Sequence, residues 1–136
     1  MMLDWDGYRQ ELLKRIGDLG RLSPATVRGY RELSDAGSKT ARLDAKTREL
    51  IAVAVGVTRQ CDGCITTHVQ AARAQGATAE EIAEALGVAI AVNAGAALVF
   101  SARVMDAVIA GESPLAFEHQ HLTARTEDIS ERDNRT

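Results

Sequence analysis

Two cysteines, three positions apart, are the residues of this chain whose types and spacing point most directly to chemistry. They are Cys61 and Cys64, the only cysteines among 136 residues, and His68 follows four positions later. A bridge between them closes so short a loop that it adds little stability through chain entropy, which favours redox chemistry over structural cross-linking. On a helix, the three side chains would fall within an arc of about 60° on one face.

Cys61 is expected at or just before the first turn of a helix, where free backbone N–H groups and the helix dipole favour an anion. Cysteines in this position commonly have a lowered thiol pKa, and the thiolate is the nucleophile. His68 could move protons near neutral pH. The pair alone also allows a structural zinc half-site or two ordinary buried thiols. Zinc usually takes four ligands, and the other histidines, His119 and His121, lie in the C-terminal segment.

The elements predicted to position these residues are helices. The hydrophobic fraction is 46%, with one Trp, two Tyr, two Phe and two Pro, and this composition favours an all-α fold over a sheet. Helices are expected over about residues 4–19, 24–35, 45–57, 62–75 and 79–110. The apolar run Leu50–Val55 could by periodicity alone be a buried strand, but its charged lead-in favours a helix. No βαβ pattern surrounds the cysteines, which disfavours a thioredoxin fold.

Start and stop signals support these boundaries. Ser23 before Pro24 predicts a helix start, and Gly37 predicts the end of that helix. Asp44 is a candidate N-cap for the third helix. Thr78 and Glu81 have the spacing of a capping box at the start of the long fifth helix.

The fifth helix is apolar nearly all round, which in a small domain predicts burial on several sides. Small residues recur along it at Gly87, Ala91 and Gly95 and would let another helix approach closely. We therefore expect part of this helix to meet another subunit. Residues 1–112 are predicted to form a single all-helical domain, and residues 113–136 a polar, mobile tail. Asn93, Trp5 and Tyr30 are interpreted as packing residues.

Charge and hydropathy restrict the partners. A net charge of −3 gives no basic surface for nucleic acid. Charged residues interrupt the apolar positions of the first 20 residues, so no signal peptide is expected. The run Ala85–Phe100 contains Asn93 and falls short of the roughly 20 strongly apolar residues of a membrane span. We expect a cytoplasmic protein without membrane partners.

The stretch Lys46–Arg73, KTRELIAVAVGVTRQCDGCITTHVQAAR, closely resembles the carboxymuconolactone decarboxylase-like family in its alkylhydroperoxidase D-like branch. The branch pattern is Glu-x11-Cys-x2-Cys-x3-His, and Glu49, Cys61, Cys64 and His68 match each of its positions. The resemblance continues through GATAEEIAEAL and covers about residues 40–110. It implies an alkylhydroperoxidase D-like helical bundle that associates into homotrimers or homohexamers.

The resemblance also implies roles for these residues. Cys64 would attack a hydroperoxide and become a sulfenic acid, while Cys61 would donate a proton and then close the disulfide. Glu49 and His68 would relay protons. Neither flavin nor metal is required by the motif, and an external dithiol, a lipoyl group or a thioredoxin-like protein, would supply electrons. Relatives often carry His or an aromatic residue where this chain has Gly63, which puts peroxidase efficiency in question.

Two other functions stay open at the level of sequence. The family also contains γ-carboxymuconolactone decarboxylases, although decarboxylating members characteristically lack the cysteine pair. A thiol-based sensor or oligomeric binding module without turnover would present the same residues as a slow peroxidase. Steady-state peroxide consumption with a dithiol donor distinguishes the three functions. The leading prediction is a thiol-dependent peroxidase or disulfide oxidoreductase.

Overall fold

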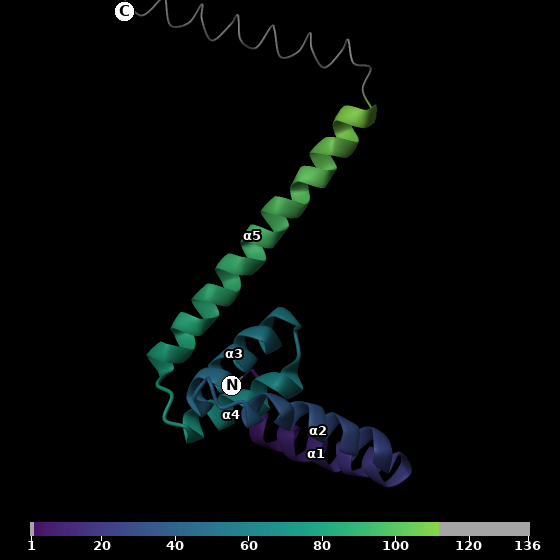
Figure 1. Ribbon diagram of the computed structural model, residues 1–136, viewed down its shortest axis with the longest axis vertical. Helices are drawn as coiled ribbons and strands as arrows, with labels where there is room; N and C mark the ends of the chain where they lie inside the picture. Colours follow the sequence, from purple (N-terminus) through teal and green to yellow (C-terminus); the bar gives the residue numbers. More distant parts are fainter. Residues whose placement is uncertain (1, 112–136) are drawn as a thin grey trace, which may run out of the picture. The chain divides into compact units, whose positions relative to one another are not determined.

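The computed structural model describes residues 2–111, and every regular element among them is a helix (Figure 1). The helices are α1 (Trp5–Leu22), α2 (Pro24–Lys39), α3 (Ala45–Thr58), α4 (Asp62–Ala74) and α5 (Ala79–Gly111). The predicted all-α fold is confirmed, and the ambiguous run Leu50–Val55 lies inside α3. The predicted tail, 113–136, lies outside the described residues.

The chain forms two compact units, one comprising Met1–Asn93 and the other beginning at Ala94, so the boundary falls within α5. In the first unit α3 packs along α4, and α1 contacts both α2 and α4 (Figure 1). The fully buried side chains are few and mostly small, with Val53 on α3 and Ala72 on α4 the least exposed. That residues 1–112 form a single domain stays a prediction.

Several helix starts are capped as the sequence predicts. The Asp44 carboxylate accepts a hydrogen bond of 2.7 Å from the backbone N–H of Thr47, satisfying one of the free donors of α3. Thr78 and Glu81 form a reciprocal capping box. The Thr78 hydroxyl accepts from the Glu81 N–H at 3.2 Å, and the Glu81 carboxylate accepts from the Thr78 N–H at 2.9 Å. These caps fix where α3 and α5 begin.

The end of α2 differs from the prediction. Gly37 does not stop the helix, which continues to Lys39, and the left-handed residue that follows is Ala41 with φ of 48°. The position of Gly37 is exposed and a Cβ there would meet no atom within 4 Å, so nothing in the packing requires glycine. A glycine inside an exposed helix costs only about 1 kcal/mol relative to alanine. This cost is small enough for α2 to continue past Gly37 to Lys39.

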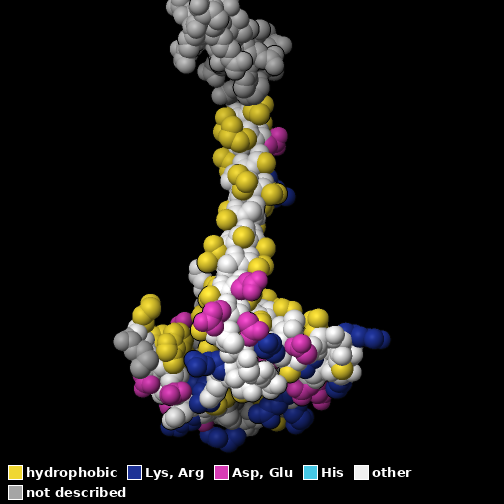
Figure 2. Space-filling view, turned by 90° about the vertical axis from the view of Figure 1, so that its left-hand side faces the viewer, with side chains coloured by type: hydrophobic (Ala, Val, Ile, Leu, Met, Phe, Trp, Pro, Cys, Tyr) yellow, Lys and Arg dark blue, Asp and Glu magenta, His cyan; other side chains and the backbone are white. Residues whose placement is uncertain are grey.

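The part of α5 that belongs to the second unit is largely apolar and exposed among the residues that the structure describes. From Ala94 to Gly111 each residue is exposed; Leu98 is 76% and Phe100 63% accessible. Figure 2 shows hydrophobic side chains, in yellow, along this helix with few charged ones between them. Tyr30 on α2 is also exposed, at 67%, so the interpretation of Tyr30 as a packing residue is wrong within the protomer.

By length and composition alone, α5 could cross a membrane, since it has 33 residues and a best-window mean hydropathy of 1.9. Apolar residues continue past Phe100 to Ile109, although Arg103 and Asp106 interrupt them, and the expectation that Ala85–Phe100 does not span a membrane stays a prediction. A single helix of this kind is weak evidence for a membrane span, because a core helix passes the same test.

Candidate redox-active site

The short connection between α3 and α4 sets the position of the first cysteine. Gln60 has a positive φ of 51°, the left-handed conformation that commonly ends a helix. Its N–H donates to the Val57 carbonyl at 3.0 Å, and the N–H of Cys61 donates to the Gly56 carbonyl at 3.0 Å. These two bonds make a Schellman motif, although the left-handed residue is glutamine rather than the usual glycine.

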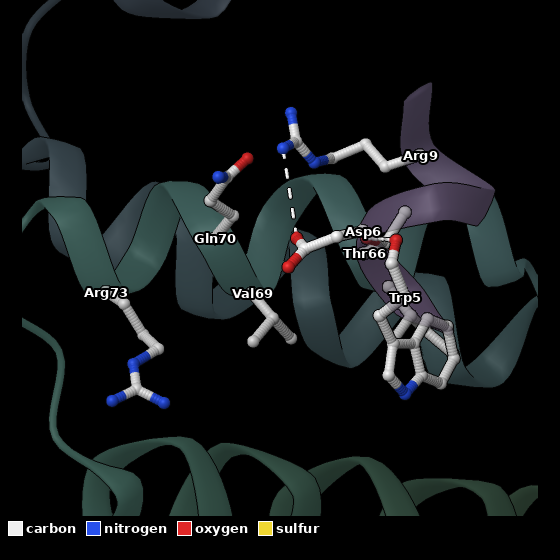
Figure 3. Close-up of a pocket in the computed structure, with 8 residues that line it drawn as sticks. Trp5, Asp6, Arg9, Thr66, Val69, Gln70 and Arg73 are labelled. Carbon is white, nitrogen blue, oxygen red and sulfur yellow. Dashed lines mark hydrogen bonds and ion pairs between the residues drawn. The ribbon is translucent and has the colours of Figure 1, made fainter. Parts of the chain in front are cut away.

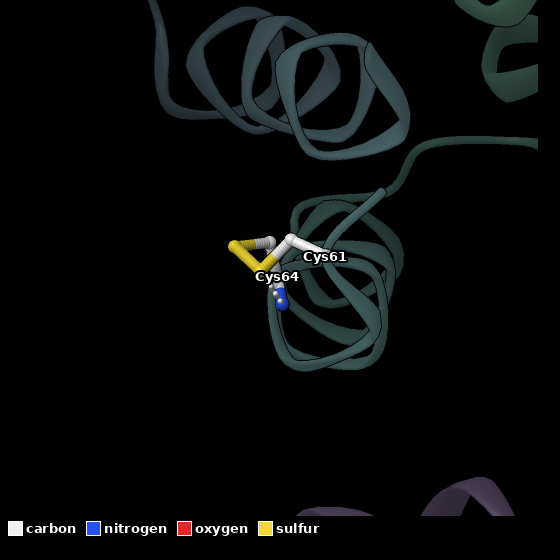
Figure 4. Close-up of a disulfide and its surroundings, with 2 residues drawn as sticks. All are labelled: Cys61 and Cys64. Atoms are coloured by element: carbon white, nitrogen blue, oxygen red, sulfur yellow. Dashed lines mark hydrogen bonds between the residues drawn. A yellow bond between two sulfur atoms is a disulfide. The ribbon is translucent and has the colours of Figure 1, made fainter. Parts of the chain in front are cut away.

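Cys61 therefore closes α3 and opens α4. It is the N-cap of α4, and its Sγ accepts a hydrogen bond of 3.1 Å from the N–H of Cys64. The two cysteines form a disulfide at the start of α4, with Cα atoms 5.2 Å apart (Figure 4). This separation lies within the range of about 4.4–6.8 Å usual for disulfides, as the sequence predicts. The sulfur of Cys61 thus lies where free backbone donors favour an anion.

Close helix packing holds Cys64 against α3. Gly56 is buried, and a Cβ built on it would lie 3.1 Å from the Cys64 Cβ. Such a contact is tighter than most Cβ contacts, and the Cys64 Cβ is too near the backbone to move freely. The glycine thus allows α3 to approach α4 at the second cysteine.

Gly63, the departure from the family pattern, has a packing explanation. A Cβ on this residue would lie 2.7 Å from the Cδ2 of Leu12, on α1. A His or aromatic side chain at this position would overlap with Leu12 unless the Leu12 side chain or α1 moved. The glycine therefore accommodates α1, and the sequence alone did not indicate Leu12 as its neighbour.

Glu49 and His68 meet across the α3–α4 pair. The Glu49 Oε2 lies 2.8 Å from the His68 Nδ1, and the side chains are 27% and 34% exposed. An ionised carboxylate can only accept a hydrogen bond, so this contact places a proton on Nδ1. In the neutral ring the Nε2 atom is then left as the proton acceptor. The predicted approach of Glu49 to the face of α4 that bears His68 is observed.

A second ionic contact joins the starts of α3 and α5. The Lys46 Nζ lies 2.6 Å from Glu81 Oε1. This hydrogen bond, together with that from the Thr78 N–H, lowers the pKa of the Glu81 carboxyl, and the same contact raises the pKa of Lys46. Both side chains are about one-third exposed, so water screens the ion pair and it contributes only modestly to holding the start of α3 near the start of α5.

The four predicted site residues thus all lie on the α3–α4 pair, two at its tight connection and two facing each other further along. Sequence reasoning missed Gln60 and Gly56, which hold the connection and the close approach. Among residues 2–111, no group of three His, Cys, Asp or Glu side chains is arranged to hold a metal ion.

The chain is similar to a protein of known structure and to several curated proteins. A carboxymuconolactone decarboxylase family protein from Legionella pneumophila, solved in its apo form, is 33% identical and superposes with a TM-score of 0.63. The similarity covers 76% of this chain and 92% of that protein. An uncharacterized protein from Haemophilus influenzae is 44% identical over 107 residues, which are 79% of this chain and 95% of the relative. Uncharacterized protein 4 in the cox locus of Paracoccus denitrificans is 42% identical over 60% of this chain and 74% of its own length.

The family model described as the carboxymuconolactone decarboxylase family matches residues 24–107, which is more than half of the chain and includes both cysteines, Glu49 and His68. With the fold and the relatives in agreement, the chain belongs to the carboxymuconolactone decarboxylase family.

Proposed function

We propose that this protein is a thiol-dependent peroxidase or disulfide oxidoreductase of the alkylhydroperoxidase D-like branch. The observation that carries the proposal is the 2.8 Å contact between Glu49 and His68 on the same helix pair as the Cys61–Cys64 disulfide. Two thiols within bonding reach and an oriented imidazole are the groups that a thiol peroxidase cycle needs. No other arrangement of the described residues offers both.

In the proposed cycle the thiolate of reduced Cys64 attacks one oxygen of a hydroperoxide. The O–O bond breaks, Cys64 becomes a sulfenic acid, and the other oxygen leaves as an alcohol after taking a proton. Cys61 then attacks the sulfur of Cys64, so that the disulfide forms and water leaves. An external dithiol, a lipoyl group or a thioredoxin-like protein, reduces the disulfide and restores both thiols.

Glu49 and His68 are proposed to manage the protons of this cycle. His68 follows Cys64 by four residues on α4, where side chains are neighbours with Cβ atoms about 5–6 Å apart. Because Glu49 occupies Nδ1, the Nε2 atom is free to accept the thiol proton. Cys61, held at the helix start, is well placed to supply a proton and then to resolve the sulfenic acid.

Steady-state peroxide consumption tests the proposal. The purified protein is given a hydroperoxide with either dihydrolipoamide or a thioredoxin system, and turnover is followed by loss of peroxide. We expect Glu49→Gln and His68→Gln to lower the rate about 10²-fold, toward the lower end of general acid–base effects. The exposed Glu84→Gln on α5 is the matched control and should leave the rate unchanged. Wild-type rates in both site variants would contradict the relay.

The same assay separates the rival functions. A thiol sensor would consume about one equivalent of peroxide per protein and then stop, even with the reductant present. A γ-carboxymuconolactone decarboxylase would release carbon dioxide from that lactone, and activity would survive removal of both cysteines. The presence of the cysteine pair supports the peroxidase over the decarboxylase.

We also propose that the protein acts as a homo-oligomer, a trimer or a hexamer, with α5 in the interface. Large exposed apolar surfaces usually mark interaction sites. The second part of α5 carries such a surface from Leu98 to Ile109. A second copy of the chain supplies apolar surface of the same kind, and a lipid bilayer is the rival occupant.

A further inference from the structure

A cleft between α1 and α4 lies apart from the cysteines. Its volume is about 530 Å³, within the range of roughly 300–1,000 Å³ typical of small-molecule sites. The hydroxyl of Thr66 donates to the Trp5 carbonyl at 3.3 Å and joins the start of α1 to α4 at this point. The residues of α4 that line the cleft are Ile65, Thr66, Val69, Gln70 and Arg73, and neither Cys64 nor His68 is among them.

The walls of the cleft are apolar and its edges are charged. Trp5, Ile65 and Val69 supply the apolar surface, and Arg9 and Arg73 supply two guanidinium groups. Figure 3 shows Trp5, Val69 and Arg73 extending to the same side of α4, with Arg9 at another edge of the group. An apolar surface with a few charged groups at its edges is a composition that small ligands can use.

The charges in the cleft favour a single negative group. Asp6 also lines the cleft and lies 3.9 Å from Arg9, so it offsets one of the two positive charges. Arg73 forms no ion pair with the residues that the structure describes, and its guanidinium can bind a carboxylate through two parallel hydrogen bonds. The cleft therefore carries one uncompensated positive charge, although the whole chain has a net charge of −3.

We propose that this cleft binds a small amphipathic monocarboxylate, with its apolar body against Trp5 and Val69 and its carboxylate on Arg73. The site is independent of the proposed peroxidase, because its lining excludes all four residues of that site. Trp5 is the only tryptophan of the chain, so its fluorescence reports directly on whether the cleft is occupied.

Fluorescence titration of the full chain with three probes tests the proposal. Octanoate has both the apolar body and the charge, octanamide has the body without the charge, and acetate has the charge without the body. We expect octanoate to change the Trp5 emission saturably, octanamide to bind at least about tenfold more weakly, and acetate to have no effect. Equal binding of octanoate and octanamide would overturn the proposal.

Three substitutions complete the experiment. Arg73→Gln should reduce octanoate affinity to that of octanamide, because the charged partner is lost. Asp6→Asn should increase octanoate affinity, since it frees Arg9. Arg42→Gln, at an exposed position outside the cleft, is the matched control and should bind as the wild type does. If Arg73→Gln and Arg42→Gln behave alike, the proposal is wrong. It is also wrong if Trp5 emission depends on protein concentration and not on octanoate, because a second copy of the chain would then cover the cleft.

Discussion

The left-handed conformation of Gln60 predicts that glycine at this position stabilises the protein. A left-handed conformation costs a non-glycine residue about 1–2 kcal/mol. The greater freedom of glycine in the unfolded chain cancels about 0.4–1 kcal/mol of the gain. We therefore expect Gln60→Gly to raise the free energy of unfolding by about 0.5–1 kcal/mol. For a unit of this size that raises Tm by roughly 2–8 °C.

The equivalent motif at the end of α4 provides the reverse test. Gly76 has φ of 82°, its N–H donates to the Arg73 carbonyl at 3.0 Å, and the Ala77 N–H donates to the Ala72 carbonyl at 3.0 Å. A Cβ on Gly76 would meet nothing within 4 Å, so only the backbone conformation opposes alanine. Gly76→Ala should therefore lower the free energy of unfolding by a similar amount, about 0.5–1 kcal/mol.

Arg59→Gly is the matched control for Gln60→Gly. Arg59 is adjacent and exposed, but it has an ordinary right-handed conformation with φ of −86°. Glycine gains nothing there and should destabilise the fold by about 0.4–1 kcal/mol through unfolded-state entropy. Thermal unfolding followed by circular dichroism under non-reducing conditions measures all three variants. If Gln60→Gly and Arg59→Gly lower Tm equally, the left-handed strain has no energetic consequence and the reasoning fails.

Three further predictions concern packing, charge and assembly. Gly56→Ala should destabilise the protein by about 1–3 kcal/mol in thermal unfolding, because the added methyl group meets the Cys64 Cβ at 3.1 Å; unchanged stability would show that the helices can separate freely. Glu81→Gln should lower stability at neutral pH by removing the ion pair with Lys46. The pKa of the Glu81 carboxyl is lower in the folded protein than its ordinary value of 4.5. Its contribution to the free energy of unfolding is therefore fully present above pH 4.5 and is lost as the pH falls through the folded pKa. The advantage of the wild type over Glu81→Gln in urea unfolding should accordingly vanish in acid. Leu98→Glu should reduce the mass measured by light scattering toward that of a monomer; a wild-type mass, or detergent-dependent solubility of the wild type, would contradict α5 as a subunit interface.

Local signals were sufficient to predict the helices and most of their boundaries. The Asp44 cap and the Thr78–Glu81 box each depend on side chains that bond to backbone groups three residues away, so they can be read from adjacent sequence. The approach of Glu49 to His68 came from the resemblance to a family with the same spacing. Spacing alone would not have placed residues on two helices together.

Features without a residue type to mark them, or that depend on tertiary contacts, could not be predicted. The Schellman motif at Gln60 lacks the glycine that usually marks it, so no residue type revealed it. Gly63 was interpreted only as a departure that puts peroxidase efficiency in question, whereas a Cβ built on it would meet Leu12, more than fifty residues earlier in the chain. Trp5 was interpreted as a packing residue, and it lines an open cleft between α1 and α4. The surroundings of Gly63 and Trp5 depend on how α1 packs on α4, which local sequence does not encode.

Mass spectrometry of Cys61→Ser after one equivalent of hydroperoxide tests the proposed division of roles between the cysteines most directly. We expect one oxygen to be added at Cys64 as a sulfenic acid, with no disulfide and no further turnover in the presence of dithiol, because the resolving thiol is absent. Cys64→Ser, the matched variant, should consume no peroxide above the uncatalysed rate. If Cys64→Ser retains wild-type turnover while Cys61→Ser accumulates no oxidised thiol, Cys64 is not the residue that attacks the peroxide.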